Sequence, residues 1–186
     1  MPLPTRDTTH FFDQAVQFFE NGLNTEATER FASCVAEGGL PEEVWYSMYS
    51  IARIRHASGQ ADPRSIVQGY AEAYDFCPAR LEPVAHLAKL YREAGDHQTA
   101  YELSRLIFET PRPEVGLFLE PLVYDLLLPL EFIQACRALG RADESEKLVR
   151  RLLRGKDLPQ DIRNLIRGST EPEYLTFVDP AWWESS

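Results

Sequence analysis

The amino-acid sequence predicts an all-α fold, a right-handed helical-repeat solenoid of about four helix-turn-helix units. Four glycines carry this prediction, because each ends one segment of helical apolar spacing and precedes another. They are Gly22, Gly59, Gly95 and Gly140, and their intervals are 37, 36 and 45 residues. Repeats of paired helices have periods of this size. Since glycine tolerates the left-handed backbone that ends a helix, we interpret the four as the ends of first helices.

Alanines recur at a constant distance from these glycines. Ala15, Ala52 and Ala88 each lie seven residues before the glycine of their unit. A side chain this small allows two helix backbones to approach closely, so we expect all three alanines in the core.

Start and stop signals divide the chain into eight helices and a short ninth helix after Pro159. Asn24, Asp62-Pro63 and Asp96 supply polar or proline starts for second helices. Pro129 lies inside the seventh helix, where it must kink the helix or mark where the regular part begins. The expected ranges are 8–21, 24–37, 41–58, 63–76, 81–94, 97–110, 120–139 and 142–154.

Three regions follow from this reading: an N-terminal extension at 1–7, the repeat domain at 8–168, and an acidic, aromatic C-terminal tail at 169–186. The aromatic side chains of the tail have two interpretations. They cover an exposed end of the solenoid, which we favour, or they anchor a partner. These side chains are Tyr174, Phe177, Trp182 and Trp183.

Composition narrows the class of function. The net charge of −10 argues against a general binder of nucleic-acid backbones, which needs a basic face. The three cysteines are far apart and form no zinc-binding spacing, so a reducing compartment is the simplest interpretation. No stretch resembles a signal peptide or reaches the roughly 18 apolar residues of a membrane span. We therefore expect a cytoplasmic protein that does not enter a membrane.

The repeated residues resemble the consensus of a known family. Tyr91, Gly95, Ala100 and their equivalents are similar to the tetratricopeptide repeat (TPR). A narrower resemblance covers about 34–167, through GGLPEEVWYSMYSIA, CPARLEPVAHLAKLYREAGDHQTAYEL and LFLEPLVYDLLLPLEFIQACRALG. These stretches look like the TPR region of some bacterial family 2 glycosyltransferases, in which the repeats accompany a sugar-nucleotide-binding catalytic domain. That domain is missing here, with no DxD triplet and no strand-rich nucleotide-binding segment.

Local motifs for catalysis are also missing. The four histidines have no metal-ligand spacing and pair with no nucleophile motif, and the sequence has no glycine-rich phosphate loop. Carboxylate pairs fall at helix starts, where the helix dipole stabilises acids. We therefore expect no catalytic residue, no metal and no cofactor. An enzyme that uses His86 and Glu131 is the third and most distant hypothesis.

The inner, concave face lined by the first helices is the surface that we expect to bind a partner. In a chain that is otherwise strongly acidic, this face gathers four cationic side chains, which could hold the carboxylates of an acidic peptide. They are Arg53, Lys89, Arg92 and Arg137. The alternative is that these cations are solvated or paired with Glu82, Glu93 and Glu131. The predicted groove consists of Tyr46, Tyr49, Arg53, His56, Lys89, Arg92, Gln134 and Arg137.

A second cationic run lies on one face of the eighth helix and beyond it. It could dock the acidic tail of the same molecule or an acidic partner; a nucleic-acid role is weaker, because no aromatic residues interleave with it. The run consists of Lys147, Arg150, Arg151, Arg154 and Lys156, followed by Arg163 and Arg167.

The function expected from these observations is a non-catalytic adaptor or scaffold that binds a protein or acidic peptide through the groove. The alternative is an accessory TPR module of a bacterial glycosyltransferase system that lacks the catalytic domain. The sequence identifies neither the partner nor the oligomeric state.

Overall fold

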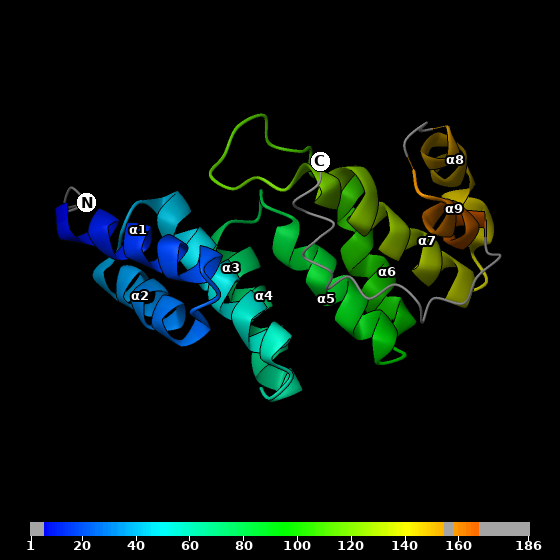
Figure 1. Ribbon diagram of the computed structural model, residues 1–186. Helices are drawn as coiled ribbons and strands as arrows, with labels where there is room; N and C mark the ends of the chain where they lie inside the picture. The colour runs from blue at the N-terminus through cyan, green and yellow to red at the C-terminus, as the bar shows by residue number, and fades with distance from the viewer. Residues whose placement is uncertain (1–5, 155–157, 168–186) are drawn as a thin grey trace.

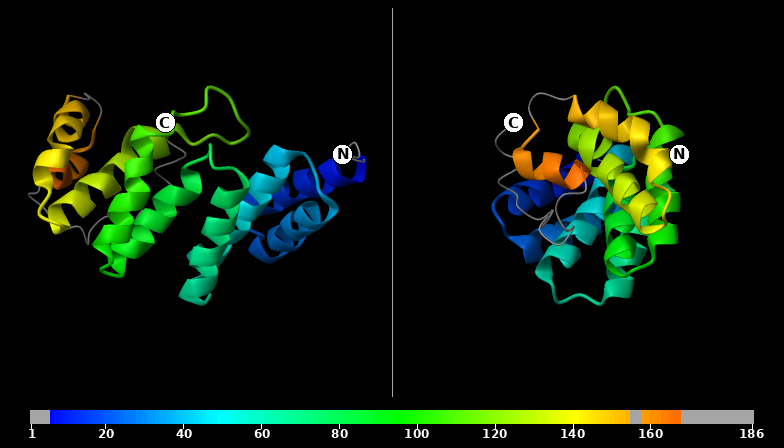
Figure 2. Two further views of the ribbon diagram at one scale, coloured as in Figure 1. Left: turned by 180° about the vertical axis from the view of Figure 1, so that it is seen from behind. Right: turned by 90° about the vertical axis from the view of Figure 1, so that its right-hand side faces the viewer.

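The structure is a computed structural model that describes residues 6–154 and 158–167. Within these residues the chain is all-α, and each helix packs antiparallel on the next (Figure 1). The elements follow one another along an elongated molecule, from α1 at one end to α8 and α9 at the other (Figures 1 and 2).

The helices are α1 (Arg6–Glu20), α2 (Asn24–Glu37), α3 (Pro41–Ser58), α4 (Pro63–Phe76), α5 (Glu82–Glu93), α6 (His97–Arg105), α7 (Leu128–Ala138), α8 (Ala142–Leu153) and α9 (Gln160–Arg167). A 3-10 turn, Leu106–Phe108 (η1), follows α6, and a π-helix, Val123–Leu127 (η2), precedes α7.

The predicted glycine stops are confirmed. Gly22, Gly59, Gly95 and Gly140 each follow a first helix and have φ of 73°, 63°, 82° and 70°. A residue with a β-carbon would be strained there, which explains why glycine marks the repeat. Gly38, at φ 75°, ends α2 in the same way, although it was not predicted as a helix stop.

The predicted helix starts are confirmed in part. Asp96 caps α6, since its carboxylate accepts a hydrogen bond from the Thr99 N–H at 3.0 Å. Pro63 lies in the first turn of α4, as expected, but the Asp62 side chain makes no capping bond. Asn24 is the first residue of α2 and not its cap.

One predicted helix was too long, and another contains an irregular turn. The expected helix at 97–110 ends at Arg105 and tightens into the 3-10 turn η1. The expected helix at 120–139 is helical over 121–138, but residues 123–127 form the π-helix η2, and α-helical geometry resumes at Leu128, next to Pro129. Pro129 therefore marks the start of the regular helix, the second of the two alternatives.

The core consists of three apolar clusters, which span different numbers of helices. The first joins α1 to α4 and takes Leu87 from α5; the second joins α5 to η2 and the start of α7; the third joins α7, α8 and α9. Ala15, Ala52 and Ala88 are fully buried, as predicted. Leu87 of α5 carries the first cluster across the junction between α4 and α5.

Among residues 6–154 and 158–167, no helix is long and apolar enough to cross a membrane. The predicted tail at 169–186 and Lys156 lie outside the described residues.

Candidate partner-binding face

The eight residues of the predicted groove lie on three successive first helices. α3 supplies Tyr46, Tyr49, Arg53 and His56, α5 supplies Lys89 and Arg92, and α7 supplies Gln134 and Arg137. Their exposure differs. Tyr46, Tyr49 and Lys89 are buried, whereas the other five are partly exposed. The buried side chains face neighbouring elements, so they build the face and leave its surface to the others.

An aromatic and histidine cluster joins α3 and α4 to α5. The Tyr49 hydroxyl is hydrogen-bonded to His86 Nε2 at 3.0 Å, and His56 Nδ1 is hydrogen-bonded to the Tyr70 hydroxyl at 3.1 Å. The rings of Tyr70 and His86 stack with their centroids 4.7 Å apart and an interplanar angle of 4°. Burial lowers the pKa of His86 well below its usual value, and nearby Arg53 lowers it further. His86 is therefore a neutral hydrogen-bonding partner in this cluster at neutral pH.

The cations of the groove are engaged within the molecule. Arg92 Nε lies 2.6 Å from a Glu131 carboxylate oxygen, and Lys89 Nζ lies 3.2 Å from Glu93. Arg137 donates to the backbone carbonyls of Leu165, at 2.7 Å, and Ile166, at the C-terminal end of α9. These pairs agree with the alternative prediction, in which the groove cations pair with carboxylates such as Glu93 and Glu131 of the same chain.

The connection between η1 and α7 reaches back over α3, and we call its residues 109–120 the strap (Figure 1). Phe118 of the strap stacks on Tyr46, with ring centroids 4.2 Å apart and an interplanar angle of 23°. Glu120 accepts from Arg53 at 3.2 Å and from the Tyr49 hydroxyl at 3.4 Å. The strap therefore covers three of the four groove residues on α3.

Arg80 holds the strap through its backbone. Its guanidinium donates to the carbonyl oxygens of Leu117 at 3.2 Å and Phe118 at 3.4 Å. The same group lies 3.8 Å above the ring of Trp45 and pairs with buried Glu82 at 2.7 Å. Because carbonyl oxygens are common to every residue, these bonds select the path of a peptide backbone and not its side chains.

The backbone of the strap is strained at Phe118, which has a positive φ of 50°. A residue with a β-carbon pays roughly 1–2 kcal/mol in this left-handed region. At Gly116 a β-carbon would lie 3.0 Å from an Arg80 nitrogen, so the strap approaches that guanidinium closely. The contacts with α3 and Arg80 hold the strap despite the strain at Phe118.

The carboxyl group of Glu120 is the charged end of this contact. Burial raises the pKa of Glu120, and the Arg53 guanidinium opposes the rise. Its side chain is 15% exposed, and that of Arg53 is 29% exposed. The ion pair of Arg53 and Glu120 is therefore partly, but not completely, shielded from bulk water.

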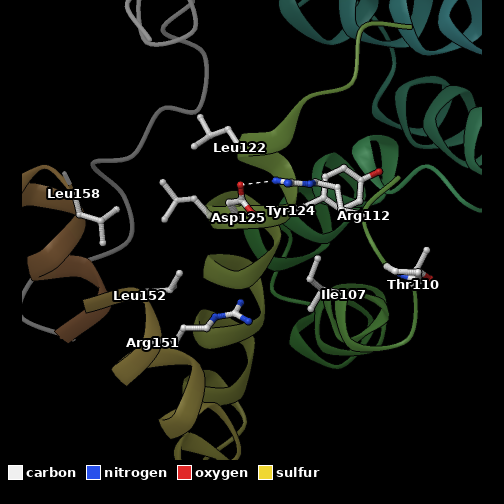
Figure 3. A pocket seen from close by; sticks show the side chains of 11 residues that line it. Ile107, Thr110, Arg112, Leu122, Tyr124, Asp125, Arg151, Leu152 and Leu158 are labelled. Carbon is white, nitrogen blue, oxygen red and sulfur yellow. Dashed lines mark hydrogen bonds and ion pairs between the residues drawn. The ribbon is translucent and has the colours of Figure 1, made fainter. Parts of the chain in front are cut away.

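A separate cavity of about 560 Å³ lies beside the other end of the strap (Figure 3). Apolar side chains of η1, η2, α8 and the segment before α9 line much of it. Arg112 and Asp125 form an ion pair of 2.8 Å at this cavity, and Arg151 of the predicted cationic run points into it (Figure 3). Its lining includes Ile107, Thr110, Leu122, Leu126, Leu152 and Leu158.

The strap, Glu120 and Arg80 were not predicted from the sequence. The signal was the third interval, which is 45 residues where the first two are 37 and 36. The surplus falls on the proline-bounded segment between the third and fourth units, where the strap lies. Spacing locates such an insertion but does not show that it folds back onto the second unit.

The fold and this face define the class of protein: an all-α, TPR-like helical repeat protein. The chain is similar to a crystal structure from Podosopora anserina, described as nearly identical TPR-like repeats of a candidate kinesin light chain. The two share 21% sequence identity and a TM-score of 0.53, over 88% of this chain and 82% of the other. At this identity the likeness shows the fold alone.

No family model matches the chain, and neither does any curated protein sequence. The link to glycosyltransferases therefore stays a prediction from the sequence resemblance. Within the described ranges 6–154 and 158–167, no group of three or more histidine, cysteine or carboxylate side chains is placed to hold a metal ion.

Proposed function

We propose that this protein is a non-catalytic adaptor that binds an acidic, aromatic segment of a protein partner on the predicted groove. The observation that carries the proposal is the strap, which lies on the groove as a peptide would. Within four residues it presents an aromatic ring to Tyr46, carbonyl oxygens to Arg80 and a carboxylate to Arg53. A TPR-like fold, which generally binds proteins, supports the same class of function.

The charges on α3 and beside it suit an acidic ligand. Arg53 and Arg80 both point at the strap in a chain whose net charge is −10. An acidic partner is repelled by the molecule as a whole, so recognition must come from these short-range contacts. Charge-assisted hydrogen bonds to a carboxylate are about twice as strong as neutral ones, which favours an acidic segment over a neutral one.

The groups that a catalytic hypothesis would use have other partners. His86 is hydrogen-bonded to Tyr49 and stacked on Tyr70, and Glu131 is paired with Arg92. Both side chains join one helix to another. This engagement supports a role in building the face, and we propose no reaction for it.

The test uses a labelled peptide with the strap sequence PEVGLFLEP (113–121) and the full chain carrying Phe118→Ala, which loosens the internal strap. We expect Arg53→Gln in this background to weaken peptide binding about tenfold, a change of about 1.4 kcal/mol. Arg55→Gln is the matched control, because Arg55 lies on the same helix and is exposed. Binding should also weaken with added salt, which screens partly exposed charges over about 8–10 Å.

Fluorescence anisotropy titrations measure both variants. Equal affinities for the Arg53→Gln and Arg55→Gln proteins would remove α3 from the binding surface. Arg92→Glu is not a suitable variant for this purpose. It would place a second carboxylate beside buried Glu131 and disturb the fold together with the groove.

A further inference from the structure

The strap has a second copy in the sequence. Residues 113–121 read PEVGLFLEP, and residues 172–180 read PEYLTFVDP. Both fit the pattern Pro-Glu-x-x-x-Phe-aliphatic-acid-Pro, which occurs at these two places in the 186 residues. Four of the nine positions are identical, and two more differ only between leucine and valine or between glutamate and aspartate.

Two of the six shared positions carry the side chains that hold the strap on α3. Phe118, which stacks on Tyr46, corresponds to Phe177, and Glu120, which pairs with Arg53, corresponds to Asp179. Side-chain contact with α3 thus falls where the two copies agree.

Two of the three positions that differ are tolerant ones. Val115 is 84% exposed and Leu117 is 38% exposed, so the strap sequence is free to vary there. At the third, Leu175 replaces Gly116, and a β-carbon there would lie 3.0 Å from an Arg80 nitrogen, so Arg80 must shift to admit the second copy. Arg80 bonds the strap through carbonyl oxygens, which any sequence supplies.

We propose that residues 172–180 bind the same site on α3 of their own chain, in exchange with the strap, so that two internal segments compete for one groove. This inference rests on the proposed function, since it names a ligand for that groove. The strained backbone at Phe118 lowers the cost of releasing the strap. An outside partner must then displace both segments, and a change in the tail regulates access to the groove.

The tail is long enough to reach the site. Phe177 is the tenth residue after Arg167, the end of α9, and an extended chain of ten residue steps spans about 33–36 Å. The path from α9 to α3 crosses α7 and α5; packed helices lie about 8–10 Å apart, and the gap between α3 and α5 is wider, so the tail must be almost fully extended to reach the site. The effective concentration of a tethered segment depends on how well its length matches this span.

The test titrates a labelled PEYLTFVDP peptide into full chains that carry Phe118→Ala, with the tail either intact or disabled by Phe177→Ala and Asp179→Asn. We expect about tenfold tighter binding when the tail is disabled, because the internal competitor is lost. Glu120→Gln is a second opening variant, and Val115→Ala, which alters a highly exposed strap residue, should leave the affinity of the otherwise unchanged protein as it is. Circular dichroism checks the fold of each protein.

Each outcome decides the proposal. Equal affinity with the tail intact or disabled overturns it. If PEVGLFLEP binds and PEYLTFVDP does not, the tail is excluded while the proposed function stands. If neither peptide binds, both proposals fall. Light scattering that shows concentration-dependent dimers of the Phe118→Ala chain, lost when the tail is disabled, would assign the tail to a second copy and overturn binding within one chain.

Discussion

Two neighbouring junctions between first helices are built in different ways. The backbones of α5 and α7 approach each other directly, and apolar side chains such as Val84 and Leu128 share one core cluster there. The backbones of α3 and α5 stay further apart. They are joined by the hydrogen bond between Tyr49 and His86, by the tilted contact of the same two rings, and by the strap, whose Glu120 bonds Arg53 of α3 and Glu82 of α5.

This difference suggests that the junction of α5 and α7 is the rigid one and that the junction of α3 and α5 is the one able to bind a ligand. A directly packed junction leaves no room for a ligand, because its side chains already fill the space. A junction bridged by polar groups and an inserted segment has interactions that another segment could replace. This difference supports the proposal that a partner binds at α3 and α5, with the junction of α5 and α7 as the support for that face.

The largest expected effect is a difference in unfolding free energy between variants that break the ion pair at each junction. Arg92→Ala leaves the buried carboxylate of Glu131 without its closest cation, which should cost about 3–5 kcal/mol of unfolding free energy. Arg53→Ala should cost about 1 kcal/mol or less, because the side chains of Arg53 and Glu120 are both partly exposed. Urea denaturation of the two variants measures the difference.

A rescue experiment checks the cause. Arg92→Met combined with Glu131→Leu replaces the pair by apolar side chains and should restore most of the lost stability, since the uncompensated charge is gone. Equal losses for Arg92→Ala and Arg53→Ala would show that the two junctions do not differ as described.

The second prediction concerns the alanines of the two halves. Ala52→Leu should destabilise the protein by roughly 1–3 kcal/mol, because Ala52 is fully buried and a larger side chain would overpack the core. The space is already tight, since a β-carbon added to Gly69 would lie 3.1 Å from the β-carbon of Ala52. Ala88→Leu should cost a similar amount in the neighbouring cluster. Unchanged denaturant midpoints for both variants would contradict the tight packing of these helix pairs.

Much of the fold followed from the sequence because its signals are local. A glycine with positive φ ends each first helix whatever the helix packs against, so Gly59 and Gly95 could be placed from their surroundings. The buried alanines followed from the same register. Pro129 also indicated an irregularity in this helix, although the sequence did not specify the π-helix at Val123–Leu127.

The site was harder to predict because its contacts span long distances in the sequence. Arg53 and Glu120 are 67 residues apart, and no spacing in the sequence pairs a residue of α3 with one of the strap. The groove residues could be placed on the correct helices by register. Their burial could not, since Tyr49 is covered by His86 and the strap.

The third prediction tests the polar junction through pH. Burial lowers the pKa of His86, so below the unfolded value of about 6.5 the unfolded chain binds a proton more readily than the folded one. Its contribution to stability is therefore present above pH 6.5 and is lost as the pH falls toward the folded pKa. The loss is up to about 1.4 kcal/mol per pH unit.

The measurement is the difference between the unchanged protein and His86→Gln, in chemical denaturation from pH 7.5 to 5.5. This difference should shrink as the pH falls. Glu120 and Glu131, whose pKa values are raised by burial, act in the opposite direction in both proteins and largely cancel. A constant difference would mean that His86 accepts a proton as easily in the folded chain as in the unfolded one.

The smallest expected effect isolates the strained backbone of the strap. Phe118→Ala and Phe118→Gly both remove the stack on Tyr46, so they differ only in the backbone at φ 50°. Alanine retains the left-handed strain, while glycine relieves it and gives back part of the gain through the entropy of the unfolded chain. We expect the glycine variant to be more stable by about 0.5–1 kcal/mol in urea denaturation. If alanine is equal or better, the strap has left the groove once its ring is gone, and Arg80 and Arg53 alone do not hold it against α3.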